Sequence, residues 1–110
     1  MPERQPMSEA MYYILLALRH PVHGYGIMQR VRELSGGRLV LGPGTLYGVL
    51  TRMQGEGLIV LEGINGRRKV YTLTETGQEA LLAEYRRLKQ MVEDSSVLEE
   101  GSVRVSMGEG

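Results

Sequence analysis

An Asn-Gly step between two short β-prone runs is the feature that most limits what this chain can fold into. The runs are residues 58–61 and 70–73, and the step between them is Asn65-Gly66. Asn-Gly favours a tight hairpin, because a type I′ turn needs positive φ at both central positions. Most of the remaining sequence has helical periodicity. We therefore predict a mainly α protein with one small β-hairpin.

Three helical segments precede this hairpin and one long segment follows it. The first covers residues 9–19 after the capping residue Ser8, and it is apolar on every face. The second starts near residue 25 and stops before Ser35-Gly36-Gly37. The third starts at Pro43, which suits the first turn of a helix, and ends at residue 57.

The fourth helix is predicted from Thr74 to about residue 94. Its apolar residues recur at intervals of four, three and four, which is typical of a helix–helix seam; they are Leu81, Tyr85, Leu88 and Val92. This seam and the fully apolar first helix both need cover, so we predict a homodimer with these four residues in its interface. The segment order then divides the chain into a flexible arm (1–7), a winged helix-turn-helix (8–74), a dimerisation helix (75–94) and a polar tail (95–110).

The composition removes several classes of function. There is no cysteine, which excludes disulfides and thiolate metal sites. The apolar run at residues 11–18 is far shorter than the roughly 20 residues of a membrane helix. No acid pair, nucleophile with a nearby base or phosphate-binding loop is visible, so we expect no enzyme, no cofactor and no metal. A cytoplasmic protein with no membrane partner is expected.

The charges are unevenly distributed although they sum to zero. Residues 10–74 carry eight cations against three anions, whereas residues 75–110 carry four against eight. Eleven of the thirteen cations are Arg, the side chain best suited to binding phosphates and guanine edges. A basic body of this kind predicts a polyanion as its partner.

The winged-helix order places candidate DNA contacts on two elements. In the third helix, the face opposite the apolar stripe can enter the major groove, and it carries Thr45, Tyr47, Thr51 and Arg52. Gly48 lies on the same face and would allow close approach. The hairpin is the wing, and its cations Arg67, Arg68 and Lys69 are candidate phosphate contacts.

Three segments of the chain resemble the PadR family of bacterial transcriptional regulators. They are His23-Gly24-Tyr25-Gly26-Ile27, Gly44-Thr45-Leu46-Tyr47 running on to Gly57-Leu58-Ile59, and Gly66-Arg67-Arg68-Lys69-Val70-Tyr71. The single helix after the wing is similar to the short-tailed subgroup. The resemblance implies a homodimeric transcriptional repressor that binds double-stranded DNA. By position it implies DNA contacts for Thr45 and Tyr47 on the third helix and for Arg67, Arg68 and Lys69 on the wing.

The resemblance also implies that a small effector enters near the dimer interface. Together with the apolar seam it suggests an effector site near Tyr13, Leu88, Met91 and Val92. Leu88 stands where multidrug-binding members place an aromatic side chain on this helix. A rival hypothesis is a winged-helix module that binds another protein instead of DNA.

Overall fold

The computed structural model describes residues 6–100, apart from the side chains of residues 64 and 65. The elements, in chain order, are α1 (Glu9–Ala17), β1 (Val22–His23), α2 (Gly24–Leu34), α3 (Pro43–Gly55), β2 (Ile59–Asn65), β3 (Arg68–Leu73) and α4 (Glu75–Asp94). The mainly helical winged fold with a long last helix confirms the predicted fold class. Most of the predicted arm and the last ten residues of the predicted tail lie outside the described residues.

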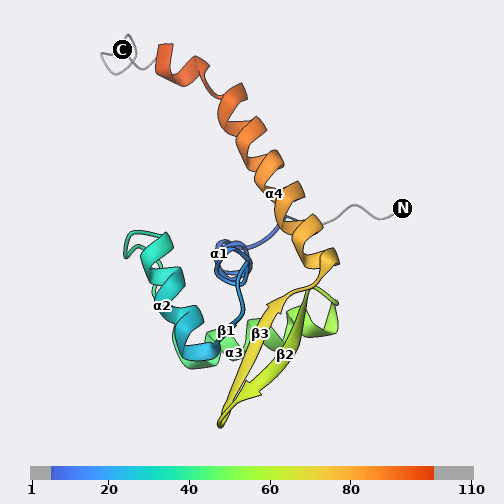
Figure 1. Ribbon diagram of the computed structural model, residues 1–110. Helices are drawn as coiled ribbons and strands as arrows, with labels where there is room; N and C mark the ends of the chain where they lie inside the picture. The colour runs from blue at the N-terminus through green and yellow to red at the C-terminus, as the bar shows by residue number, and fades with distance from the viewer. Residues whose placement is uncertain (1–5, 101–110) are drawn as a thin grey trace.

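Helix α1 lies at the centre of the body, with α2 on one side and the start of α4 on the other (Figure 1). The Ser8 hydroxyl accepts a hydrogen bond from the Met11 N–H at 3.1 Å, which confirms the predicted cap. Ile14, Leu15 and Leu18 are fully buried. The opposite face, with Tyr12, Tyr13 and Leu16, is only half-buried within this chain, so α1 is not covered on all sides.

Helix α3 packs its apolar stripe of Leu46, Leu50 and Met53 into the same core. Pro43 occupies the first turn, as predicted, and the capping position Gly42 makes no side-chain hydrogen bond. The stripe leaves the other face of α3 on the outside of the molecule. The fold therefore holds α3 by one side only.

The sheet has a third strand that the sequence analysis did not predict. Val22 and His23 pair with Tyr71 and Val70, so β3 lies between β1 and β2. Two residues between a proline and a glycine carry no readable periodicity, and only the tertiary fold makes them a strand. The consequence is that the start of α2 is fastened to the wing.

The predicted type I′ turn at Asn65-Gly66 is wrong by one residue. Asn65 pairs with Arg68, so Gly66 and Arg67 are the central residues. Gly66 has φ 67°, and no non-glycine residue in the described part of the chain has positive φ, which is the sign pattern of a type II′ turn. A bulge between Leu61 and Gly63 adds one residue to β2 and sets this register.

Helix α4 begins one residue after β3 and then leaves the body (Figure 1). The Thr74 hydroxyl caps it by accepting from the Gly77 N–H at 2.9 Å. Its first half buries Gly77, Ala80, Leu81 and Glu84, while its second half is exposed. The radius of gyration is 17.3 Å, against about 13 Å for a compact chain of about this length.

The described chain extends past the predicted end of α4. Residues 97–100 form a further helical turn after a short break at 95–96, within the segment predicted as a polar tail. The domain boundaries at residues 74 and 94 stay predictions. Among the described residues, no helix combines the length and the apolar character needed to span a bilayer.

The close contact between α4 and Leu58, the residue that precedes β2, gives the first prediction. A Cβ added at Gly77 would lie 1.9 Å from the Leu58 carbonyl oxygen, a backbone atom that cannot move aside. We expect Gly77→Ala to lower the free energy of unfolding by about 1–3 kcal/mol. Chemical denaturation measures this, with Gln78→Ala, an exposed neighbour in the same turn, as the control. A Gly77→Ala protein as stable as wild type would contradict the packing described here.

Candidate nucleic-acid interface

A cationic groove lies where the wing meets the start of α2 and the outer side of α3. Its volume is about 460 Å³. It is lined by His23, Gly24, Tyr25, Tyr47, Arg67, Arg68, Lys69 and Tyr71. No acidic side chain is among these lining residues, so within the described part of the chain the charged groups of the groove are all basic.

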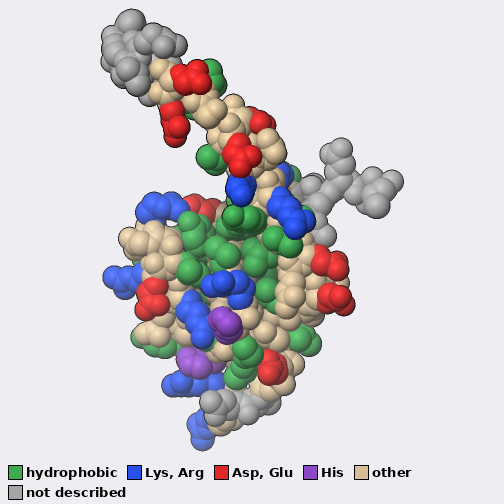
Figure 2. Space-filling model, turned by 45° about the horizontal axis from the view of Figure 1, so that its top comes forward, with side chains coloured by type: hydrophobic (Ala, Val, Ile, Leu, Met, Phe, Trp, Pro, Cys, Tyr) green, Lys and Arg blue, Asp and Glu red, His purple; other side chains and the backbone are tan. Residues whose placement is uncertain are grey.

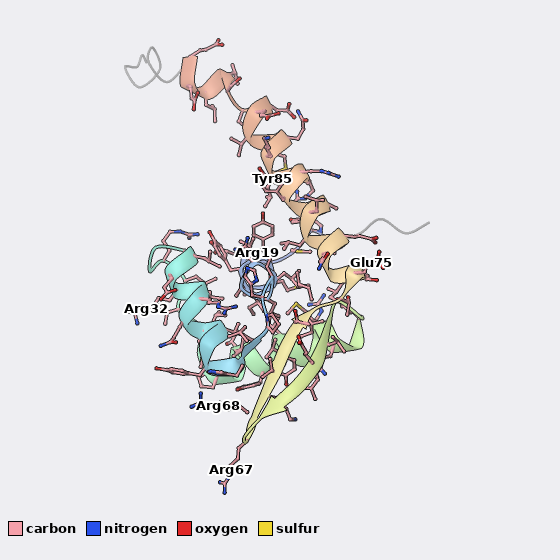
Figure 3. All side chains as sticks on the ribbon, in the orientation of Figure 1. Arg19, Arg32, Arg67, Arg68, Glu75 and Tyr85 are labelled. Atoms are coloured by element: carbon pink, nitrogen blue, oxygen red, sulfur yellow. The ribbon has the colours of Figure 1, made fainter. Side chains whose placement is uncertain are left out.

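Arg67 and Arg68, two of the three basic residues of the wing, point in different directions (Figure 3). Arg67, at the turn, projects from the tip of the hairpin away from the body. Arg68 lies back toward the start of α2, and its Nη1 is 3.2 Å from His23 Nε2. Lys69 is exposed beside them. The wing therefore offers separate contact points and not a single cluster.

The predicted reading face of α3 is exposed along its whole length. Thr45 is exposed in the first turn, and Thr51 and Arg52 are exposed further along. The Thr51 hydroxyl donates to the Tyr47 carbonyl at 2.9 Å, which leaves its oxygen free to accept. Arg52 Nε donates to Glu56 Oε2 at 3.1 Å, a surface pair worth about 1 kcal/mol at most.

The Tyr47 side chain of α3 packs against the start of α2 at Gly24. Its ring is 47% exposed, but its hydroxyl lies so close to Gly24 that a Cβ at that position would be 2.2 Å from it. Gly24 thus leaves the space in which the hydroxyl rests. Tyr71 lies behind it, and burial first, with the charge of Tyr47 second, raises the pKa of Tyr71. The Tyr71 phenol therefore stays a protonated donor near neutral pH.

Two of the cations counted in the basic body, Arg30 and Arg38, are not among the groove residues and bind partners within the fold. Arg30 Nη1 donates to the carbonyl oxygens of Ala17 and His20, closing the C-terminal end of α1. Arg38 forms an ion pair with Glu9 at 2.7 Å and donates to the Tyr13 hydroxyl. Hydrogen bonding to Glu9 is the main reason why the pKa of Arg38 is raised.

The charge separation predicted from the sequence is visible on the surface. Figure 2 shows basic side chains gathered around the histidines on the body, and acidic side chains along the protruding helix.

A second, apolar hollow of about 340 Å³ lies between α1 and α4. It is lined by Tyr12, Leu16, Arg19, Leu73, Gln78, Leu81, Leu82 and Tyr85. Burial, followed by the charges of Tyr85 and Glu84, raises the pKa of Tyr12. This hollow is open on the side that faces away from the core.

The structure distributes the predicted interface and effector residues over three places. Leu81 belongs to the core of its own chain, and Tyr85 lines the hollow. Leu88 is half-buried, and Met91 and Val92 are exposed further along α4. The Tyr13 hydroxyl accepts from Arg38, and none of Tyr13, Leu88, Met91 and Val92 is among the residues that line the hollow.

Sequence reasoning missed His23 and Gly24 as parts of the groove. Both belong to the PadR-like segment at residues 23–27, but nothing in the sequence indicates that this segment lies against the wing. The signal is the β1–β3 pairing, which appears only in the fold. Within the described residues, no group of three or more potential ligands could hold a metal ion.

Comparison with known proteins decides the family. The family model described as "Transcriptional regulator PadR-like family" matches residues 14–83. The chain belongs to the PadR-like family. Its members are transcriptional regulators, so the prediction that this chain is not an enzyme is confirmed. The resemblance predicted from the three motifs is confirmed as well.

Relatives of this PadR-like chain include two bacterial proteins. A transcriptional regulator of Mycobacterium tuberculosis is 34% identical over 97 residues, covering 86% of this chain and 88% of the relative. An uncharacterized 37.1 kDa protein from a transposon of Streptomyces fradiae is 37% identical over 99 residues. That match covers 86% of this chain but only 28% of the Streptomyces protein, so the chain spans a fraction of its length.

Solved structures agree with the fold of the PadR-like chain. A PadR family regulator from Clostridium difficile superposes with a TM-score of 0.71 at 29% identity, covering 80% of this chain and 95% of that one. Bacillus subtilis PadR, solved in complex with operator DNA, gives a TM-score of 0.62 at 30% identity, covering 73% of this chain and 48% of that one.

Proposed function

We propose that this PadR-like regulator binds a specific sequence in double-stranded DNA. The observation that carries the proposal is the juxtaposition of an exposed face on α3 with the basic groove at the wing, described above. A helix held by one side can enter the major groove, and cations beside it neutralise the flanking phosphates. The similar Bacillus subtilis protein crystallised with operator DNA, which supports the same use of the fold here.

The proposed roles follow from where each side chain lies. Thr45 and Thr51 contact base edges, Thr45 from the N-terminal turn that recognition helices usually present. Arg52, once it leaves Glu56, reads guanine through its paired donors. Tyr47 donates its hydroxyl to a phosphate. Arg67, Arg68 and Lys69 hold phosphates next to the wing.

The protein acts as a homodimer through α4. The exposed half of this helix presents apolar side chains with nothing in the described chain to cover them, among them Tyr85 at 48% and Val92 at 70% exposure. Covering these side chains and the half-buried face of α1 would stabilise the pair by about 25 cal/mol per Å² of apolar surface. Two copies related by a twofold axis would then present two α3 helices to one face of DNA.

Repression released by a small effector is the regulatory part of the proposal. The apolar hollow between α1 and α4 adjoins the proposed interface, because Leu81 and Tyr85 belong to both. An occupant there can change the angle between protomers, and with it the spacing of the two α3 helices, which must match about 34 Å. The effector must bind the free dimer more tightly than the DNA-bound dimer.

Salt dependence separates DNA binding from the rival, a protein-interaction module. Affinity for a duplex selected from a random pool should fall steeply with salt, because each phosphate contact contributes about 0.9 to the logarithmic slope. Replacing Arg67, Arg68 and Lys69 by Ala should flatten that slope and weaken all duplexes similarly. Fluorescence anisotropy at several salt concentrations measures both effects. Failure of the pool to enrich any sequence, with salt-independent binding, would favour the protein-interaction module.

Close approach of α3 to DNA predicts opposite effects of one substitution on stability and binding. A Cβ at Gly48 meets nothing within 4 Å in the protein, so Gly48→Ala should stabilise the helix by about 1 kcal/mol. The methyl group would project toward the DNA and weaken binding about tenfold, or about 1.4 kcal/mol. Thermal melting and anisotropy measure the two effects.

Gly55→Ala is the matched control, because Gly55 is equally open but ends α3. It should leave DNA affinity unchanged. Equal DNA affinity for Gly48→Ala and wild type would show that this turn of α3 does not approach the duplex.

The dimer proposal is tested on the exposed end of α4. Val92→Glu places a charge in the proposed interface, far from the core, and should shift the protein from dimer to monomer at micromolar concentration without loss of helix content. Gln90→Glu adds the same charge to another exposed face and should stay dimeric. Analytical ultracentrifugation gives the masses. A wild-type monomer at these concentrations would refute the proposal.

A further inference from the structure

His23 uses its two ring nitrogens for two different purposes. Nδ1 accepts a hydrogen bond from the Gly26 N–H at 3.2 Å, which caps α2. A neutral imidazole carries one N–H and one lone pair, so acceptance at Nδ1 leaves the proton on Nε2. The same Nε2 lies 3.2 Å from Arg68 Nη1, and a guanidinium nitrogen only donates.

His23 Nε2–H and the Arg68 guanidinium are therefore two donors side by side. The opposite tautomer would let Nε2 accept from Arg68, but it would set two N–H groups against each other at Gly26. Two facing N–H groups at Gly26 would remove the cap of α2. The two facing donors at Nε2 are instead on the exposed side, where an acceptor from another molecule can bind both. The tautomer that caps the helix is the one that leaves a donor pair.

The backbone fixes the separation of this pair. His23 faces Val70 across the β1–β3 ladder, and Arg68 is two residues along on the same strand. Residues two apart on a strand point to the same face, so Arg68 is the diagonal neighbour of His23. The donors are thus positioned by the pairing of β1 with β3 and not by the turn at Arg67.

The groove around this donor pair is lined by no negatively charged side chain that could accept hydrogen bonds from it. The residues that line it supply phenols and two further cations, and no carboxylate is among those that the structure describes there. An acceptor that fits two converging donors in a basic groove is an anionic oxygen.

We propose that His23 and Arg68 together bind one phosphate of the DNA backbone, His23 as a neutral donor and Arg68 as the charge. This inference rests on the proposed DNA binding and adds to it a residue outside α3 and the wing. The contact would fix the register of the start of α2 on the duplex, because the same imidazole holds that helix and the phosphate.

Three variants test the proposal on the full chain. His23→Asn keeps a side chain that caps helices well but is too short to reach the phosphate. Arg68→Gln removes the charge, and Arg67→Gln is the matched control on the same wing. On the selected duplex, His23→Asn and Arg68→Gln should each weaken binding about tenfold. The double variant should lose less than the product of the two, because both groups hold one phosphate.

A methylphosphonate scan locates the contact. Single phosphates of the selected duplex are replaced by neutral methylphosphonates. Wild-type binding should weaken at one position in each half-site, and replacement at that position should have no further effect on His23→Asn or Arg68→Gln. In Arg67→Gln that position should still respond. Thermal melting checks that His23→Asn is folded. If it is unfolded, the phosphate contact is tested by the scan with Arg68→Gln and by NMR of the His23 ring in the wild-type protein.

The tautomer of His23 gives a readout without DNA. Long-range ¹H–¹⁵N NMR should show Nδ1 unprotonated and Nε2 protonated in the free protein. A protonated Nδ1, or an unchanged methylphosphonate pattern in the variants, would overturn the inference while leaving the proposed DNA binding intact. Absence of any salt-dependent duplex binding by wild type would overturn both.

Discussion

The burial of α1 is the constraint on which the other elements depend. Ile14, Leu15 and Leu18 have no exposed surface, and α2 and α4 lie against the helix on different sides. Its C-terminal end is closed by the Arg30 guanidinium, and the Leu18 carbonyl accepts from the Leu73 N–H at 3.3 Å, where the wing returns to the body. Because α1 anchors both the helix-turn-helix and the base of the wing, the groove between them keeps one shape.

The sequence predicted the elements that are marked by their own apolar periodicity or by residues typical of a helix start. Pro43, Thr74 and the stripe from Leu46 to Met53 are local signals, and the structure places α3 and α4 where they predict. The missed features depend on contacts between distant segments. Strand β1 exists only because β3 lies beside it, and the turn at Gly66-Arg67 follows from a bulge in β2. For the same reason His23 could not be assigned to the groove, since its neighbour Arg68 lies 45 residues away in the chain.

Charge counting located the basic face but not the roles of its residues. Of the eight cations in residues 10–74, Arg30 and Arg38 are committed to carbonyl, carboxylate and hydroxyl partners on or beside α1. Such side chains are held in place by the fold and contribute to the field around the body without being available as movable contacts. The wing cations Arg67 and Lys69 have no such partners among the described contacts, a difference that a count of charges does not reveal.

The junction at Thr74 has a mechanical consequence. One residue, Thr74, separates β3 from α4. Its N–H donates to the Leu58 carbonyl at 3.0 Å and its hydroxyl donates to the Gly57 carbonyl at 2.6 Å, so it is fixed to the turn between α3 and β2. The direction in which α4 leaves the body is therefore set at the residue where the wing ends. The wing and the helix proposed to form the dimer share this one fixed point, so the orientation of one is tied to that of the other.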